Sequence, residues 1–402
     1  MLRELPPTAG LPLRWTDFFS PPNGRTLESA IAEYLHVRHV FITSSATAGI
    51  VIALLVMKEQ SRRSTVIVPG YTCPLVAIAI HRAGLKIKPV DTAPDSFDFD
   101  LEELQEACDG DTLCVIPTHL GGLCSKMDEV MQIARASGAF VLEDAAQSLG
   151  AKYKDQFVAT IGDINVISLT RGKGLTIYEG GAITTNDDAL AERLKATLSS
   201  TLERSSIREL TQSLSLVGYW MLYNPVGLNI AYGAPLRQHL QNGELEKAVG
   251  EDFSMSVQIE GVSQFRKNVG LAAFSRLNET IRSNRERGQS RADQLAKIHG
   301  LKVLREDANI DGSWPFIMVL LSKNELRDKV LKRLWTRGLG ITRLFLYELP
   351  RYAYLKNIIP HYDIPNAADF SERMLTITNS EWLDDERFDQ ILHEINDCLR
   401  VG

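Results

Sequence analysis

Two residues in the first half of the chain have types that could form a catalytic pair. Asp144 ends the apolar run "FVLED", and Lys173 lies between glycines in "TRGKG". A buried carboxylate is costly unless a cation or hydrogen-bond donors hold it, and a lysine amine can bond covalently to a carbonyl carbon. The simpler interpretations are a helix cap for Asp144 and a solvated loop residue for Lys173.

Further polar residues come directly after other apolar runs. Ser45, Ala46 and Thr47 follow "HVFIT" and open an apolar helical pattern, whose first N–H groups and dipole favour an anion. Gln147 comes one turn after Asp144, and Ser168 ends "NVIS". A plain N-cap explains the first group when it is taken alone.

His119 ends the run "LCVIPTH". No second His, Cys or carboxylate stands at metal-ligand spacing from it, so the sequence predicts no metal site there. We expect His119 to line a site.

The elements that position these residues alternate between strands and helices. Short apolar runs at 39–43, 64–71, 86–91, 113–119, 140–144, 165–170 and 180–186 read as strands, with helical patterns at 46–59, 73–84 and 126–138. This alternation predicts an α/β fold with a mainly parallel sheet covered on both faces. Ligands of such sheets gather at the carboxyl ends of the strands, where the polar residues stand.

One common cofactor needs this set of groups. Pyridoxal phosphate takes a lysine for a Schiff base, a carboxylate for its ring nitrogen and a helix N-terminus for its phosphate. A nucleoside-triphosphate loop is excluded because Ile167 stands where the first glycine of G-x-x-x-x-G-K would be. A nicotinamide site is disfavoured because no G-x-G-x-x-G follows the first strand.

The sequence resembles the DegT/DnrJ/EryC1/StrS family of sugar aminotransferases, which have the fold of type I pyridoxal-phosphate enzymes. The resemblance runs from about Thr26 to the C-terminus and thins between residues 190 and 260. It is carried by "SSATAGIVIAL", "VPGYTCPLVAIAIHRAGLKIKPVD", "VIPTHLGGLCSKMDEV", "VLEDAAQSLGAKY", "ISLTRGKGLTIYEGGAITTND" and "IPNAADFSERMLTIT".

The resemblance implies a role for each matched residue. Lys173 would form the Schiff base and move protons, Asp144 would hold the ring nitrogen, and Gln147 would lie at the ring hydroxyl. The phosphate would be held by Ser168 and by the helix start at Ser45, Ala46 and Thr47. His119 and Glu179, the glutamate of "EGG", are expected on the substrate side.

One position departs from the family. The family usually has an aromatic residue, stacked on the cofactor ring, after the Thr of this strand end, and this chain has Cys73. We expect Tyr71 or another group to cover that face of the ring, or the ring to be held less firmly, and we count both Tyr71 and Cys73 among the cofactor-binding residues.

The implied reaction is the transfer of an amino group from an amino acid, by analogy glutamate, to a keto-sugar, by analogy linked to a nucleotide, in a homodimer. Family members with His at the lysine position carry out dehydration, so Lys173 favours transamination. Two alternatives stay open: other pyridoxal-phosphate chemistry of the dehydratase or lyase type, and a regulator that binds the cofactor without catalysis.

The bulk composition fits such an enzyme. The chain has 402 residues, a net charge of −6 and five cysteines without disulfide or zinc spacing. We therefore expect no nucleic-acid partner and a cytoplasmic location. Near residue 250 the alternating strand and helix patterns give way to charged helical stretches. This change predicts a large domain at 1–250, with an N-terminal arm of about 25 residues, and a smaller α+β domain at 251–402.

The stretch 210–236 carries no charge. It is long enough to span a bilayer, which takes roughly 20 residues, but Asn224 and Pro225 break any helix near its middle. We expect a buried or subunit-interface segment in preference to membrane contact.

Overall fold

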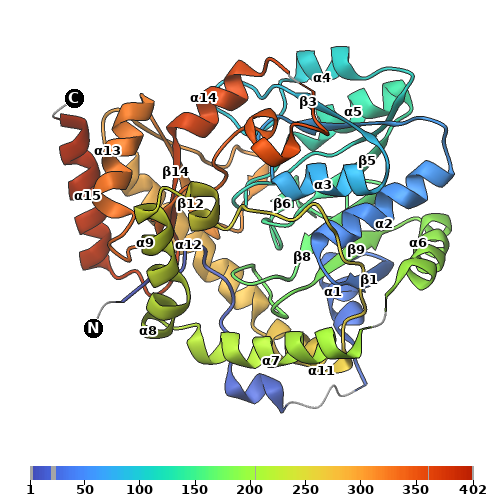
Figure 1. Cartoon of the computed structure of the whole chain (residues 1–402), viewed down its shortest axis with the longest axis horizontal. Coiled ribbons are helices and arrows are strands. Elements are labelled where there is room, and N and C mark those ends of the chain that lie inside the picture. The colour runs from blue at the N-terminus through green and yellow to red at the C-terminus, as the bar shows by residue number, and fades with distance from the viewer. Residues whose placement is uncertain (1–2, 20–23, 204, 361, 401–402) are drawn as a thin grey trace.

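The computed structural model, which describes residues 3–19, 24–203, 205–360 and 362–400, is built around a seven-stranded sheet (Figure 1). The strands lie in the order β1-β9-β8-β5-β4-β2-β3. The pairs β8–β5, β5–β4, β4–β2 and β2–β3 are parallel, and β9 runs antiparallel to β8 and β1. The bounds are β1 His39–Thr43, β2 Thr65–Pro69, β3 Lys86–Val90, β4 Thr112–Val115, β5 Phe140–Asp144, β8 Ile164–Ser168 and β9 Gly181–Thr185. The predicted mainly parallel sheet is confirmed.

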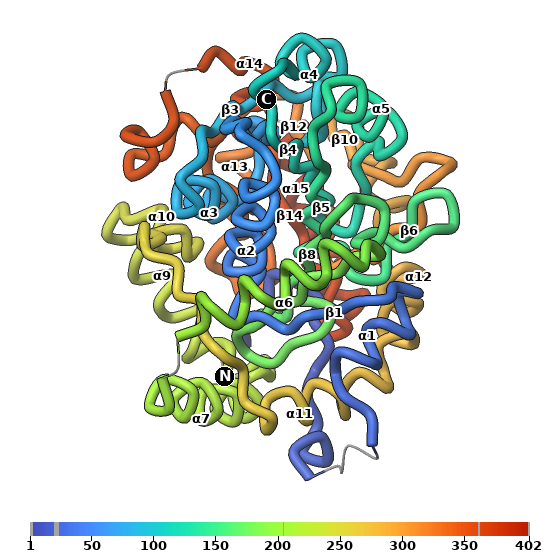
Figure 2. The backbone as a smooth tube through the Cα atoms, turned by 90° about the vertical axis from the view of Figure 1, so that its right-hand side faces the viewer, coloured from blue at the N-terminus to red at the C-terminus, as the bar shows by residue number. Residues whose placement is uncertain are grey.

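Helices cover both faces of this sheet because its strands send apolar side chains to both sides. In β2, Val66 and Val68 belong to one buried cluster and Ile67 to the other. The first cluster lies under α2 (Ala46–Glu59), α3 (Pro74–Arg82) and α6 (Asp188–Thr201), and Figure 2 shows α2 and α6 side by side on this face.

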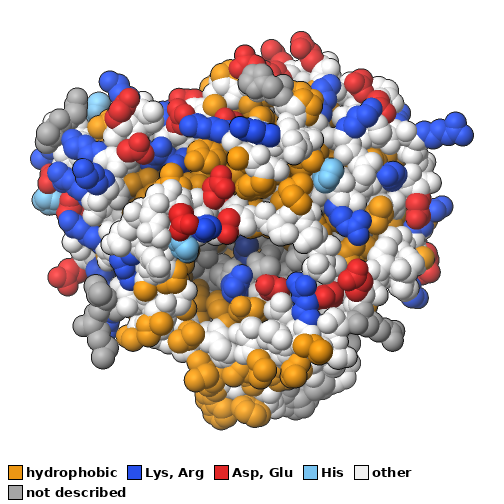
Figure 3. Space-filling model, in the orientation of Figure 1, with side chains coloured by type: hydrophobic (Ala, Val, Ile, Leu, Met, Phe, Trp, Pro, Cys, Tyr) orange, Lys and Arg blue, Asp and Glu red, His pale blue; other side chains and the backbone are white. Residues whose placement is uncertain are grey.

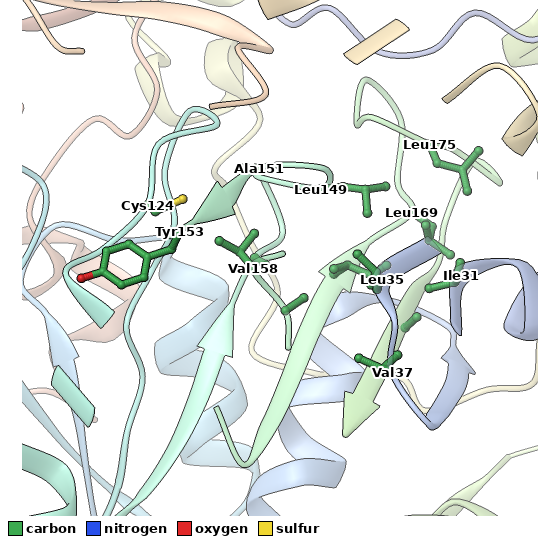
Figure 4. Close-up of a cluster of buried hydrophobic side chains, with 14 of the residues drawn as sticks. Ile31, Leu35, Val37, Cys124, Leu149, Ala151, Tyr153, Val158, Leu169 and Leu175 are labelled. Atoms are coloured by element: carbon green, nitrogen blue, oxygen red, sulfur yellow. The ribbon is translucent and has the colours of Figure 1, made fainter. Parts of the chain in front are cut away.

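The second cluster lies under α1 (Leu27–Leu35) and α5 (Met127–Ser137), and α4 (Leu101–Ala107) packs beside α5. Figure 4 shows part of it, where Ile31 and Leu35 of α1 lie near Leu169 and Leu175 from the connection between β8 and β9.

A second, antiparallel sheet comes from the C-terminal part of the chain. Its strands lie in the order β10-β12-β14-β13, and α12, α13 and α15 pack on it together with α14. The bounds are β10 Leu301–Val303, β12 Phe316–Leu321, β13 Ile341–Thr342, β14 Met374–Thr378, α12 Leu277–Leu295, α13 Asn324–Leu334, α14 Pro365–Arg373 and α15 Asp385–Arg400. Leu5, Leu236 and Ala248 share its buried cluster, so the N-terminal arm and the middle region pack on this unit. The domain boundary near residue 250 stays a prediction.

Two smaller groups complete the fold. A three-stranded sheet has the order β11-β6-β7, with β6 Lys152–Tyr153, β7 Gln156–Phe157 and β11 Ile310–Asp311. In chain order, five helices come between the two large sheets: α7 (Ser206–Leu222), α8 (Pro225–Leu228), α9 (Ala234–Gln241), α10 (Leu245–Val249) and α11 (Gln264–Phe274). Of these, α7 and α11 contact each other and lie along the lower edge of the molecule (Figure 1).

Helix α7 ends where the sequence predicted a break. The side chain of Asn224 accepts hydrogen bonds from the N–H groups of Val226 and Gly227 and so starts α8, with Pro225 in its first turn. The charge-free stretch is not buried as one of our two expectations had it, because Leu210, Leu214 and Met221 are each more than 60% exposed. Figure 3 shows an apolar patch on the lower edge of the molecule, where Figure 1 draws α7. Among the described residues, no helix is long and apolar enough to cross a membrane.

Candidate active site

A cavity of about 490 Å³ lies at the carboxyl ends of the parallel strands. Its walls include the predicted residues Ser45, Ala46, Thr47, Cys73, His119, Asp144, Gln147, Ser168, Lys173 and Glu179. These residues come from five separate strand ends and connections, and the topology brings them together because parallel strands end at one edge. Figure 3 shows the molecule hollowed above α7.

Asp144 is buried at the end of β5 and has little to hold its charge. Its carboxylate accepts one hydrogen bond, from the N–H of Ala146 at 3.0 Å, and it forms no ion pair among the described residues. Burial raises the pKa of Asp144, against the smaller effects of that hydrogen bond and of the charges on Lys173 and His119. A ligand cation in the cavity would supply the partner that the chain does not.

Lys173 enters the cavity from the connection between β8 and β9. Its amine forms no hydrogen bond or ion pair within the described part of the chain, and burial lowers the pKa of Lys173, while Cys73 and Asp144 act in the opposite direction. Gly172 has φ +72°, and its carbonyl accepts a hydrogen bond from the hydroxyl of Thr8 at 2.7 Å. The N-terminal arm thus fixes the turn that presents the amine.

The start of α2 forms an anion cradle. Ser45 caps the helix by accepting from the N–H of Ala48, and the N–H groups of Ala46 and Thr47 have no acceptor within the described residues. Ser168, at the end of β8, shares a 2.9 Å hydrogen bond with Thr170. The N–H groups and these hydroxyls suit a phosphate.

Gly181 sets how closely β9 and this helix approach each other. A Cβ atom at Gly181 would lie 2.5 Å from the nitrogen of Ala46 and 2.6 Å from the carbonyl carbon of Ser45, closer than real Cβ atoms approach. Only glycine leaves room for the helix start at this point.

Gln147 and His119 are held in fixed orientations. The Gln147 carbonyl accepts a hydrogen bond from the N–H of Gly121 at 3.1 Å, which leaves its NH₂ group for a ligand acceptor. His119 is fully buried, its Nδ1 accepts from the N–H of Ser125, and its Nε2 lies 2.9 Å from Glu143. Nε2 therefore carries the proton, and His119 offers the cavity its ring carbons and faces, with both nitrogens already bonded.

The structure separates Tyr71 from Cys73, both expected among the cofactor-binding residues. Cys73 lines the cavity, and burial raises its pKa to about 12. Tyr71 does not reach the cavity. It is fully buried behind the wall, where its hydroxyl donates to the carbonyl of Phe345 and accepts from the N–H of the same residue. Since Phe345 lines the cavity, Tyr71 supports the wall instead of forming it.

Sequence reasoning missed two walls of the cavity. One is the extended segment 251–261, which contributes Phe253, Val257 and Gln258 and is tied to Ser44 by hydrogen bonds to Gln258 and Glu260. The other comprises Arg208 and Gln212 of α7 with Arg266 of α11. Arg208, which comes just before the uncharged stretch 210–236, was the available signal, but only the tertiary fold shows that it faces the cavity together with Gln212 and Arg266.

The residues present fit pyridoxal phosphate. Within the described residues, the cavity holds a buried carboxylate without a cation, a lysine amine without a partner, and free N–H groups at the start of a 14-residue helix. These are the groups that bind the ring nitrogen, the carbonyl carbon and the phosphate of this cofactor.

Comparisons with known proteins agree with this fit. The model of the DegT/DnrJ/EryC1/StrS aminotransferase family matches residues 14–230 and 236–396. GDP-perosamine synthase of Caulobacter vibrioides is 28% identical over 82% of this chain and 78% of its own length. A pleiotropic regulatory protein of Geobacillus stearothermophilus is 36% identical over 42% of this chain and 46% of its own.

Among solved structures, Helicobacter pylori PseC, an aminotransferase involved in the biosynthesis of pseudoaminic acid, has a TM-score of 0.78 at 15% identity, with 100% of both chains covered. Several other curated relatives are matched over less than half of their own length. The predicted fold is confirmed, and with the family come its cofactor, pyridoxal phosphate, and its enzyme class. The chain belongs to the DegT/DnrJ/EryC1/StrS aminotransferase family.

Proposed function

We propose that this protein transfers an amino group from an amino acid, glutamate, to a keto-sugar linked to a nucleotide, with Lys173 as the catalytic amine. The observation that carries the proposal is the pairing of the half-buried Lys173 and the buried Asp144 in one cavity, each without an ion-pair partner among the described residues.

Pyridoxal phosphate, when bound, supplies an electron sink that stabilises negative charge on the α-carbon of an amino acid. Asp144 would keep a proton on the ring nitrogen of the cofactor, which its carboxylate can do because, in the part of the chain that the structure describes, it accepts only the hydrogen bond from Ala146. Lys173 would accept and return the proton of the substrate carbon through Nζ, because burial lowers its pKa toward the working pH.

The remaining groups would bind and orient. The Ala46 and Thr47 N–H groups, with Ser45 and Ser168, would hold the phosphate, and the NH₂ group of Gln147 would lie toward the ring hydroxyl. His119 would pack against the ligand through its ring. Glu179, which accepts a hydrogen bond from Gln212 at 2.8 Å, would line the substrate side.

The acceptor class draws on the family and on GDP-perosamine synthase, whose name specifies a nucleotide-linked amino sugar. The pleiotropic regulatory protein supports a second candidate, a regulator that binds the cofactor without turnover. Retention of both Lys173 and Asp144 favours the enzyme, because binding alone does not need a proton-moving amine.

A homodimer is part of the proposal. The exposed face of α7 carries Ile207, Leu210, Leu214 and Met221 at heptad-like spacing, and the aromatic residues Trp15 and Phe19 are exposed as well. Apolar exposure of this kind usually marks a protein interface.

The free state of the five cysteines supports a cytoplasmic location.

The absorption spectrum of the purified protein tests the function. We expect the wild type to show a visible band from bound cofactor and Lys173→Ala to lack this band. Glutamate should shift the band of the wild type to the near-ultraviolet. A band that does not respond to glutamate or to other amino acids would favour the regulator, and dehydration of the substrate in place of amination would favour the lyase-type alternative.

A further inference from the structure

The cationic side chains of the cavity differ in what already holds them. Arg266 donates to both oxygens of Glu209, at 2.7 and 2.6 Å, and to the backbone carbonyl of Glu179. Arg208 forms a 2.9 Å ion pair with Glu260. These two guanidinium groups are neutralised by the chain itself, and the Lys173 amine is committed to the chemistry proposed above.

Arg171 is different, because it has no carboxylate partner among the described residues. Its guanidinium lies 4.9 Å from the ring centroid of Tyr178, and its Nη1 donates to the Tyr178 hydroxyl at 3.2 Å. Arg171 is exposed and lines the cavity, so it stands at the mouth. An aromatic face orients a guanidinium and leaves its charge free for an anion.

The backbone that supports this arrangement is strained. Tyr178 has φ +75°, a left-handed conformation that a bulky side chain rarely adopts. The N–H of Arg171 donates to the carbonyl of Tyr178 at 2.9 Å, so the strained residue fixes both the backbone and the side chain of Arg171. Strain of this kind is typical of ligand sites.

Gln212 supplies a second unsatisfied group. Its Nε2 donates to Glu179 at 2.8 Å, and its buried Oε1 has no partner among the residues that the structure describes. Turning the amide over would place its oxygen against the Glu179 carboxylate, so the orientation is fixed. A buried acceptor without a donor is costly in a folded protein, and a ligand hydroxyl would satisfy it.

Both groups lie on one wall. Glu179 and Tyr178 belong to the same connection as Arg171, and Tyr178 packs edge-on against Tyr219 of α7, with ring centroids 6.2 Å apart. The contacts Tyr178–Tyr219 and Glu179–Gln212 join this connection to α7, so the free cation and the free acceptor lie on the same side of the cavity.

We propose that this wall is the binding subsite for the nucleotide-linked sugar: Arg171 binds its diphosphate, and Oε1 of Gln212 accepts a hydrogen bond from a sugar hydroxyl. The inference rests on the proposed function. The carboxylate of the amino donor is attached to the carbon that bears its amine, so it must lie beside Lys173, inside the cavity. A diphosphate is separated from the reacting carbon by a sugar ring and reaches the mouth, where Arg171 stands.

Calorimetry on the holoenzyme tests Arg171, with UDP, GDP and dTDP as probes and the three nucleosides as uncharged controls. We expect one diphosphate to bind, Arg171→Gln to weaken it by about tenfold or more, and Tyr178→Phe to weaken it less. Arg62→Gln, which removes an exposed arginine outside the cavity, should have no effect. Equal binding by wild type and Arg171→Gln would overturn the assignment.

The sugar contact is tested with UDP-glucose, GDP-mannose and dTDP-glucose. The nucleotide-sugar that matches the preferred diphosphate should lose several-fold in affinity in Gln212→Leu, while the diphosphate alone should keep its affinity. An equal loss for both would assign Gln212 a structural role and overturn this half of the proposal.

The response to glutamate separates this inference from the proposed function. Arg171→Gln should keep the wild-type shift of the cofactor band at the same glutamate concentration. A large rise in the glutamate requirement would mean that Arg171 binds the donor carboxylate, which contradicts the inference and leaves the aminotransferase standing. A wild type that binds a diphosphate but does not respond to any amino acid would contradict the function and leave the subsite standing.

Discussion

Glu143 and Asp144 follow each other in β5, yet the protein holds their two carboxylates in opposite ways. The Glu143 carboxylate accepts hydrogen bonds from four donors, namely the His119 ring and the N–H groups of Ala159, Ile161 and Gly162. The Asp144 carboxylate accepts one. Glu143 therefore ties the strand to its neighbours, and Asp144 is left for a ligand.

Asp144→Asn should abolish the function and preserve the fold. Asparagine keeps the shape and the hydrogen bond from Ala146 but cannot hold a proton on the cofactor ring, so we expect cofactor affinity to fall by about tenfold or more. Titration of the purified variant with pyridoxal phosphate, followed by absorption, measures the change. An affinity equal to that of the wild type would refute the pairing.

Glu143→Gln should do the reverse. The new amide would turn an NH₂ group toward N–H donors, so buried hydrogen bonds are lost. The free energy of unfolding should fall by about 2–4 kcal/mol, and the urea midpoint should fall with it. Unfolding followed by circular dichroism measures this effect. A variant as stable as the wild type would show that the four donors contribute little.

Cys73 should be unreactive in the native protein. Burial raises its pKa to about 12, so at pH 8 only about one thiol in ten thousand is ionised. Alkylation with iodoacetamide, followed by mass spectrometry, should modify Cys73 quickly in urea and slowly in buffer. Equal rates in the two conditions would contradict the burial.

Glu251 should make stability depend on pH. It accepts hydrogen bonds from Tyr352 and from the N–H of Leu346, and burial raises its pKa from 4.5 to about 7. Between these values the folded chain keeps a proton that the unfolded chain has lost, so stability falls as pH rises from about 4.5 to about 7, by up to the order of 3 kcal/mol.

Urea unfolding at pH 5 and pH 8 tests this dependence, with Glu251→Gln as the reference that cannot titrate at this position. The stability of the wild type should drop more than that of the variant between the two pH values. Parallel losses would assign the pH dependence to other groups.

The apolar face of α7 should control association. Leu214→Asp places a charge on a side chain that is 65% exposed in a single chain, so it should halve the mass measured by light scattering without unfolding the protein. Thr211→Asp adds the same charge to a polar position of the same helix and should leave the mass unchanged. A wild type that is already monomeric would rule out the proposed dimer.

The local features of the fold and of the site could be predicted from the sequence. Strand ends, the helix start at Ser45 and the order of Asp144 and Lys173 were predictable, because short-range apolar patterns and polar residues at strand ends mark them. The sequence left open whether Tyr71 covers the cofactor ring. Its side chain lies behind the wall, bonded to Phe345, because a residue two positions from the site can point away from it.

The remaining features depend on contacts between distant residues. The four donors to Glu143, the tie between Ser44 and the segment 251–261, and the Glu179–Gln212 bond join residues from 16 to 216 positions apart. The apolar periodicity of the sequence does not predict which distant residues meet, so these pairs could be found only in the folded chain.

The missing side chain of Gly181 has a consequence for changing this protein by design. Because β9 and the start of α2 approach too closely to admit even a methyl group at Gly181, any substitution there would push the anion cradle away from the strand that carries Ser168. A mutational library should therefore tolerate no other residue at this position, however permissive the outer rim of the cavity proves. The most easily overlooked residue of the site would be its least replaceable one.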